Sequence, residues 1–185
     1  MKKLRFFSML CLLALIIGFF AGCKKDENGT NNGNNGGSGS GGNGGGATQA
    51  EFVDLGLPSG TKWNSINETT NSTNGYYTFD EAVSIFGDKL PTKEQCEELM
   101  EKCTWEWQSN GSYKVTGTNG NSIVLPAAGG LDCDGYVSNV GTVGYYRSST
   151  PYNEDYAWYI SFYSDDKFIW NDSRCFGLSV RLVQD

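Results

Sequence analysis

Cysteine is the residue type that offers this chain most of its chemistry, because histidine is absent from all 185 residues. Without histidine, the chain has no Ser-His-Asp or Cys-His catalysis, no histidine-ligated zinc and no histidine pH switch. The six cysteines stand at positions 11, 23, 96, 103, 133 and 175. Attachment of another group, disulfide formation and oxidation are the reactions left to them, and the surrounding sequence indicates which apply.

Cys23 stands at the end of a segment that is organised like an export signal. Basic residues come first, the apolar run Phe6–Phe20 follows, and Ala21-Gly22 precedes the cysteine. A run of about 15 residues is shorter than the about 20 that span a membrane, and it has the length of a secretory signal. The pattern resembles a bacterial lipoprotein signal, so we expect residues 1–22 to be removed and Cys23 to carry lipid, including palmitate. The alternatives are an uncleaved anchor helix and an ordinary cleaved signal peptide.

A charged stretch and a coil follow Cys23. Residues 24–27, Lys-Lys-Asp-Glu, resemble the surface-export signal of lipoproteins in Bacteroidetes-type bacteria, and the start of a solvated linker is the alternative. Residues 28–47 are nearly all Gly, Asn and Ser, which is typical of a flexible coil with a reach of about 25 Å. We therefore expect residues 23–47 to be a lipidated N-terminus and tether, anchored in the outer membrane and facing the cell exterior.

Residues 48–185 are long enough for one domain with a single hydrophobic core. Loss of the three basic leader residues changes the net charge from −7 to −10. An acidic domain repels phosphate backbones, so we expect no nucleic-acid partner. Aromatic residues make up 14% of the chain, which suits a carbohydrate- or protein-binding surface as well as a small β-rich core.

Four cysteines remain in this domain, and an oxidising envelope permits disulfides between them. Cys96 and Cys103 lie on one predicted helix about 10.5 Å apart, beyond the about 7 Å that a disulfide allows. Of the three possible connectivities, the one that contains a Cys96–Cys103 bridge is therefore disfavoured. The other two stay open, as does a lone Cys133–Cys175 bridge with two free thiols.

The elements that would position such residues are two short helices followed by strands. Capping boxes begin the helices at Thr78 and Thr92, and we expect these helices to end near Gly87 and Lys102. From residue 105 onward, turn residues alternate with apolar segments in the manner of a β-meander. Helices first and strands mostly after them predict an α+β fold with an antiparallel sheet.

The predicted strands have clear turn signals and clear faces. Residues 51–55 and 61–66 form two short strands before the helices, while Asn110-Gly111 and Asn119-Gly120 are hairpin turns. Two later segments each place apolar side chains on one face: Trp158, Ile160 and Phe162 in the first, and Leu178, Val180 and Leu182 in the second, with Ser179 and Arg181 opposite.

Six segments in order between residues 52 and 183 together carry a family resemblance. They are Val53–Trp63 (VDLGLPSGTKW), Lys89–Glu94 (KLPTKE), Val115–Ile123, Leu125–Gly129 (LPAAG), Tyr146–Thr150 and Gly177–Val183 (GLSVRLV). The set resembles the Fibrobacter succinogenes major paralogous domain, which is common in lipoproteins of Bacteroidetes, although Arg147 stands where that family usually has Trp. The resemblance implies a fold similar to that of C-type lectins and formylglycine-generating enzymes, but no settled activity.

The same resemblance implies a possible calcium site. Trp170-Asn171-Asp172 is similar to the strand of calcium-dependent C-type lectins in which Asn and Asp oxygens bind Ca²⁺. This implies Asn171 and Asp172 as ligands, completed by a nearby acid such as Glu154, and Cys133 as the loop-closing partner of Cys175. Ordinary turn chemistry is the alternative explanation of Asn-Asp-Ser, and no other cofactor is expected.

Aromatic residues are the candidates for ligand contact. Tyr145, Tyr146, Tyr152 and Tyr156 follow a glycine-rich turn, and tyrosine tolerates a wet edge, so we expect them to form a surface that binds ligand. Trp105-Glu106-Trp107 places both tryptophans on one strand face, where core packing is the favoured explanation.

Catalysis is not expected. Formylglycine-generating enzymes use a close pair of cysteines near the C-terminal part of their fold, and only Cys175 lies there. The sequence therefore predicts a non-enzymatic, surface-displayed module that binds or adheres to glycan or protein ligands. The alternatives are a structural envelope component that packs against endogenous proteins and, less favoured, a divergent oxidase of the formylglycine-generating type.

Overall fold

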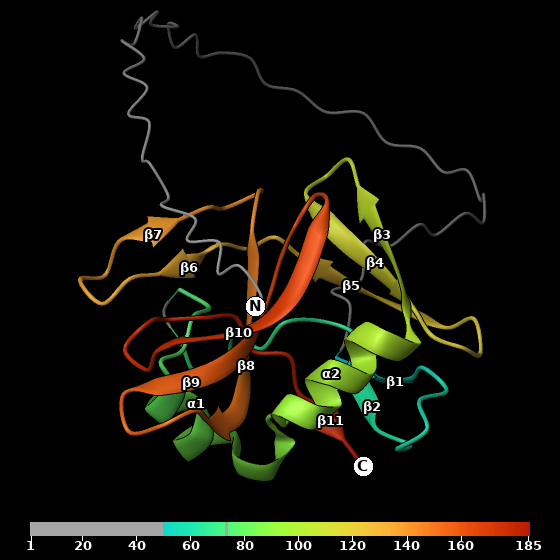
Figure 1. The fold of residues 1–185 in the computed structure, drawn as a ribbon, viewed down its shortest axis with the longest axis horizontal. Coiled ribbons are helices and arrows are strands. Elements are labelled where there is room, and N and C mark those ends of the chain that lie inside the picture. Colours follow the sequence, from blue (N-terminus) through green and yellow to red (C-terminus); the bar gives the residue numbers. More distant parts are fainter. Residues whose placement is uncertain (1–49, 73) are drawn as a thin grey trace, which may run out of the picture. The chain divides into compact units, whose positions relative to one another are not determined.

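The computed structural model describes residues 50–72 and 74–185, and their elements form an α+β fold (Figure 1). The predicted signal peptide, the lipidated Cys23 and the whole predicted tether lie outside this part of the chain. Within it, no helix is both long and apolar enough to cross a membrane.

Reciprocal side-chain caps begin both α-helices. The Thr78 hydroxyl accepts from the backbone N–H of Glu81 and the Glu81 carboxylate accepts from that of Thr78, which starts α1 (Phe79–Phe86). Thr92 and Gln95 form the same box at α2 (Lys93–Lys102). Gly87, with a φ of +54°, ends α1 and leads into the 3₁₀ turn η1 (Gly87–Lys89). The predicted helices and their ends are confirmed.

The strands pair antiparallel, as predicted, but they form several small sheets rather than one. The first contains β1 (Phe52–Asp54), β2 (Lys62–Asn64) and β11 (Val183–Gln184), and the second contains β3 (Thr104–Gln108), β4 (Ser112–Thr116) and β5 (Ser122–Pro126). A hairpin joins β6 (Gly130–Leu131) to β7 (Val137–Ser138). The longest strands, β8 (Gly144–Pro151), β9 (Tyr156–Tyr163) and β10 (Asp166–Ser173), form the third sheet in the order β10-β9-β8.

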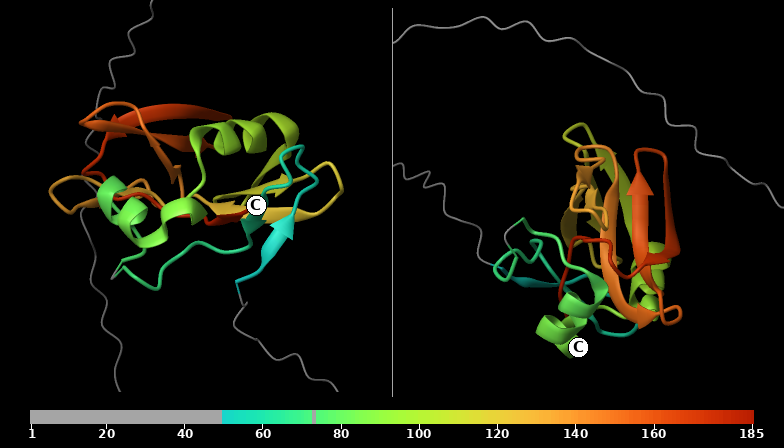
Figure 2. Two further views of the ribbon diagram at one scale, coloured as in Figure 1. Left: turned by 90° about the horizontal axis from the view of Figure 1, so that it is seen from below. Right: turned by 90° about the vertical axis from the view of Figure 1, so that its left-hand side faces the viewer.

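The β8–β9–β10 sheet has an inner and an outer face. Tyr146, Ile160 and Ile169 are paired across the strands and therefore lie on one face, which packs into the main core. We call this the inner face. The outer face carries the residues that alternate with these, among them Arg147 and Tyr159. The two helices lie apart from each other, with α1 near β8 and α2 against all three strands (Figures 1 and 2).

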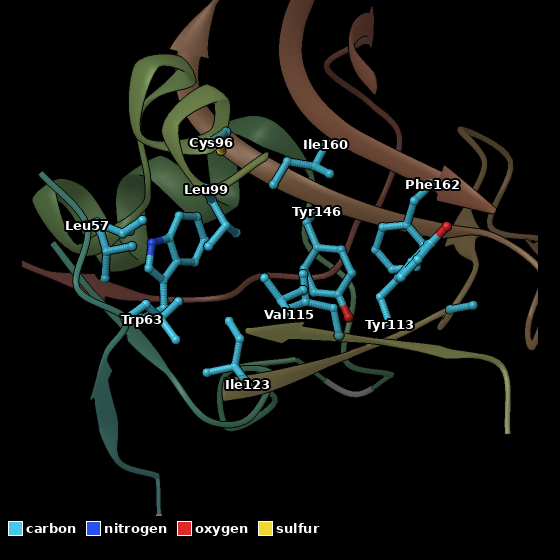
Figure 3. Close-up of a cluster of buried hydrophobic side chains, with 14 residues drawn as sticks. Leu57, Trp63, Cys96, Leu99, Tyr113, Val115, Ile123, Tyr146, Ile160 and Phe162 are labelled. Atoms are coloured by element: carbon cyan, nitrogen blue, oxygen red, sulfur yellow. The ribbon is translucent and has the colours of Figure 1, made fainter. Parts of the chain in front are cut away.

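The main core gathers side chains from β2, α2, β4, β5, β8 and β9. Figure 3 shows Tyr146 among Ile160, Phe162 and Val115, with Trp63 and Leu99 in the same cluster. Trp105 and Trp107 pack against this cluster through edge-on contacts with Tyr113 and Phe162, which confirms their predicted core role.

The C-terminal segment differs from the strand that alternation predicts. Residues 177–180 make isolated bridges to several parts of the chain, and only β11 is regular. Both predicted faces of this segment are buried. Arg181 is 1% exposed, and its guanidinium donates to the backbone carbonyls of Asn64 and Val124. These hydrogen bonds link two backbone segments within the core.

Candidate functional site

A cavity of about 220 Å³ opens between the β6–β7 hairpin, the outer face of the β8–β9–β10 sheet and the turn that follows β10. We call it the hairpin cavity. It is lined by Gly130, Leu131, Asp132, Ser138, Asn139, Tyr145, Tyr159, Asp172, Phe176 and Leu178. A second hollow of about 380 Å³ lies at the C-terminus against Phe52 and Lys89, and its lining includes no tyrosine or tryptophan.

A disulfide and a backbone bridge hold the hairpin in place. Cys133, in the β6–β7 turn, is bonded to Cys175 after β10, with Cα atoms 5.2 Å apart. Leu131 and Gly177 exchange two backbone hydrogen bonds of 2.8 Å beside it. Among the four cysteines that the structure describes, Cys133–Cys175 is the one bridge, since Cys96 and Cys103 are free; this is one of the arrangements that the sequence left open. Two walls of the cavity are therefore cross-linked to each other.

Two carboxylates in the cavity wall each have one oxygen engaged locally. Asp172 Oδ1 accepts from the backbone N–H of Ser173 at 2.8 Å. Asp132 Oδ1 accepts from the N–H groups of Asp134 and Tyr136, which is the hydrogen bonding of an Asx turn. The second oxygen of each carboxylate has no protein partner among residues 50–72 and 74–185, so each side chain keeps an acceptor for a ligand.

An asparagine and two tyrosines complete the polar lining. Asn139, the one non-glycine residue with a positive φ among the described positions, has a φ of +62°. Its amide donates to the Tyr145 hydroxyl at 3.1 Å, which leaves the hydroxyl proton of Tyr145 available. The Tyr145 and Tyr159 rings meet edge-on at 6.0 Å. The left-handed backbone conformation of Asn139 carries a small strain, and the hairpin holds the residue beside Tyr145.

The ionisable side chains at the cavity influence one another electrostatically. Burial raises the pKa of Tyr159, and the negative charge of Asp172 raises it further. Burial lowers the pKa of Arg147 to about 10, while Tyr159 and Asp172 oppose that shift. Arg147 is 1% exposed, and its Nη2 donates to the Phe176 carbonyl at 2.5 Å, but Nε and Nη1 have no partner among the described residues. The charge of Asp172 therefore acts on both a phenol and a buried cation.

Trp170 stands beside the cavity on the same face of β10 as Asp172. Its Cα is paired with that of Tyr159, which lines the cavity, yet its indole is 57% exposed. The Phe168 ring meets it edge-on at 6.4 Å. An exposed tryptophan next to a polar cavity is suited to a binding surface, because tryptophan is enriched at interfaces. The sequence pattern singled out Trp170 only as part of a motif and did not predict that its side chain is exposed.

The predicted calcium ligands are not gathered into one shell. Asn171 is paired with Trp158 and lies on the inner face, whereas Asp172 faces the hairpin cavity. Glu154 is exposed in the loop before β9, where its backbone carbonyl accepts from Arg174. Among the residues described, no group of three or more acidic, cysteine or histidine side chains could hold a metal ion. The calcium hypothesis gains no support from this geometry.

The four predicted ligand-binding tyrosines are separated. Tyr145 lines the cavity. Tyr146 is 2% exposed, and its hydroxyl donates to the Pro126 carbonyl, so its assignment to a binding surface was wrong: alternation along β8 turns it into the core. Tyr152 and Tyr156 are exposed at the other end of β8, about 20 Å from Tyr145 by the rise of a strand.

The two free cysteines are poor nucleophiles. Burial raises the pKa of the Cys96 thiol strongly, and burial with the charge of Glu98 raises that of Cys103 to about 11. Both thiols therefore stay protonated at neutral pH, when the thiolate is the reactive form.

Comparison with known proteins gives one result. Residues 92–183 match a family model described as a domain of unknown function (DUF8237). No curated protein and no solved structure matches the chain. The matched segment begins at the cap of α2, ends in β11 and contains every residue that lines the hairpin cavity.

Proposed function

We propose that residues 48–185 form a non-catalytic binding or adhesion module for glycan or protein ligands. The hairpin cavity is the observation that carries this proposal. It combines two carboxylates, an amide and two tyrosines with an exposed tryptophan at its edge, and a disulfide cross-links its walls. A small number of fixed polar groups beside aromatic surface is typical of ligand-binding sites.

The chemistry of the cavity favours binding over catalysis. Histidine is absent from the sequence, the free thiols are protonated, and Cys175 is engaged in the disulfide. A divergent oxidase of the formylglycine-generating type would need a reactive cysteine in this region, so it is the weakest of the three hypotheses.

We propose a C-type-lectin-like arrangement for this domain. Two capped helices, a set of small antiparallel sheets and a disulfide in the loop region support it. The ordered motifs that resemble the Fibrobacter succinogenes major paralogous domain support it independently, since they span residues 52–183. A solved structure that superposes on neither C-type lectins nor formylglycine-generating enzymes would contradict it.

The proposed location is the outer membrane, with lipid on Cys23 and the domain facing the exterior. Its support is the signal-like leader, the charged residues 24–27 and the coil that follows. Cells that express the full chain should incorporate labelled palmitate into it, and Cys23→Ala should abolish the label. Protease added to intact cells should remove the domain, and protection from that protease would argue for the periplasmic face.

Binding to a glycan array and to host-matrix proteins tests the function itself. The folded domain should bind a limited set of ligands on one of them. If a sample that unfolds cooperatively binds neither to the glycan array nor to the host-matrix proteins, that result would count against the proposal.

A structural envelope role is the second candidate, and one feature favours it. Tyr136, Val137 and Val140 leave apolar side chains exposed on and beside the β6–β7 hairpin. Such a patch is suited to packing against another protein. Pull-down from the native membrane distinguishes the two roles, because only the structural role requires a stoichiometric endogenous partner.

A further inference from the structure

The outer face of β10 places one flat aromatic side chain and one carboxylate next to each other. Trp170 and Asp172 are two residues apart on an extended strand, so their Cα atoms lie about 6.6 Å apart on the same face. Tyr159, opposite Trp170 on β9, continues the aromatic surface into the hairpin cavity. A single ligand ring can therefore touch the indole and the carboxylate at once.

The polar groups of the cavity require a ligand that donates hydrogen bonds. The free oxygens of Asp172 and Asp132 can only accept, while Tyr145, Tyr159 and the Asn139 amide can both donate and accept. Hydroxyl groups satisfy such a set, because each can donate to a carboxylate and accept from an amide or a phenol. The two carboxylates outnumber the one buried cation that the described residues place at the cavity, Arg147, so a ligand that carries negative charge is disfavoured.

The size of the cavity limits what enters. Drug-sized ligands occupy pockets of about 300–1,000 Å³, and the hairpin cavity is smaller, at about 220 Å³. It suits one ring with its substituents rather than an extended chain. A pyranose ring has an apolar C–H face and a rim of hydroxyls, which matches an indole beside a group of acceptors.

We infer that Trp170 and the hairpin cavity form a subsite for one neutral sugar residue, whose ring stacks on the indole while its hydroxyls bond Asp172 and Asn139 directly, without a metal ion. This rests on the proposed binding function and gives it a ligand class and a position. Peptide ligands are the competing class, since a lysine ammonium could also meet Asp172 and an aromatic face.

The test uses the purified full chain in a mild detergent. The ligands are the methyl glycosides of glucose, galactose, mannose and N-acetylglucosamine, with a short lysine-rich peptide as the competitor class. Tryptophan fluorescence and calorimetry report binding. We expect at least one glycoside to bind saturably, with a Kd on the order of 1 mM, and EDTA to leave the affinity unchanged.

Three variants and two matched controls locate the subsite. Trp170→Ala and Asp172→Asn should each weaken binding about tenfold or more, while Trp170→Phe retains most of it. Asp166→Asn is the control for Asp172, because it lies on the same face of β10 and its Oδ1 likewise accepts from the next backbone N–H, yet it does not line the cavity. Tyr152→Ala removes an exposed aromatic ring at the far end of β8. Neither control should change affinity.

The possible failures are distinguishable. Glycoside binding that survives Trp170→Ala and Asp172→Asn overturns the subsite but leaves the binding function in place. Binding that EDTA abolishes overturns direct recognition by the side chains. Peptide binding with no response to any glycoside overturns the sugar class, and no response to either set overturns the inference as a whole. The glycan-array and matrix experiments then decide whether the proposed function falls with it.

Discussion

Removal of the Cys133–Cys175 disulfide is expected to lower the free energy of unfolding more than any single surface change. The bridge closes a loop of 42 residues in sequence separation. The chain-entropy relation for such a loop gives about 4 kcal/mol at 25 °C, between the values for shorter and longer loops. Native-state contacts such as the Leu131–Gly177 hydrogen bonds remain in the double variant Cys133→Ser/Cys175→Ser, so the loss should arise mainly in the unfolded state.

Urea unfolding followed by tryptophan fluorescence measures this loss. The described residues all belong to one compact unit, so a chain that spans residues 48–185 is suitable for the assay. With a slope of about 2 kcal/mol per M urea, a loss of about 4 kcal/mol lowers the midpoint by about 2 M. Wild-type protein with a reductant should unfold at the same urea concentration as the double variant. Cys103→Ser, which changes a partly buried free thiol, is the control and should shift the midpoint far less.

One result would refute this reasoning. If oxidised and reduced wild-type protein unfold at the same urea concentration, the bridge does not constrain the unfolded chain. The cavity walls would then depend on the hairpin contacts alone.

Three further predictions concern the core and the caps. Thr92→Ala removes the side-chain cap of α2 and should cost about 1 kcal/mol in urea unfolding, and an unchanged midpoint would show that the cap is redundant. Gly144→Ala should cost about 1–3 kcal/mol, because the new Cβ would lie 2.1 Å from the Phe162 ring; a variant as stable as the wild type would mean that the ring can move aside. Stability should fall as the pH rises from about 9: folding raises the pKa of Cys103 from 9.0 to about 11 and that of Tyr159 above its ordinary 10.0, so the folded state retains protons that the unfolded state loses. Urea midpoints at pH 7, 9 and 10.5 should therefore decline in that order, and a flat profile would contradict the burial of these groups.

The hairpin cavity illustrates how far a motif can mislead about its own residues. Trp170-Asn171-Asp172 suggested one metal shell by resemblance, but an extended strand turns Asn171 toward the inner face and leaves Trp170 and Asp172 together on the outer face. Trp170 and Asp172 thus support a sugar subsite better than the three residues together support a calcium site. The alternation of side chains along a strand could have shown from the sequence alone that Asn171 and Asp172 face opposite sides of β10.

Local patterns in the sequence were sufficient to predict both helices and the faces of several strands, although not the C-terminal segment. The capping boxes at Thr78 and Thr92 determine where the helices begin, because each side chain forms a hydrogen bond with a backbone N–H only three residues away. The shared face of Ile160 and Phe162 follows from the period of a strand. The absence of histidine limits the chemistry in any fold.

The tertiary structure alone decided which faces are covered and which residues meet. Alternation places Tyr145 and Tyr146 on opposite faces of β8, but only packing shows that Tyr146 joins the core and Tyr145 the cavity. The partnership of Asn139, Tyr159 and Asp172 comes from three segments that the sheet and the disulfide bring together. Such contacts depend on long-range packing, which short-range periodicity does not encode, so the sequence by itself determined the elements and the excluded chemistry, while the fold determined the site.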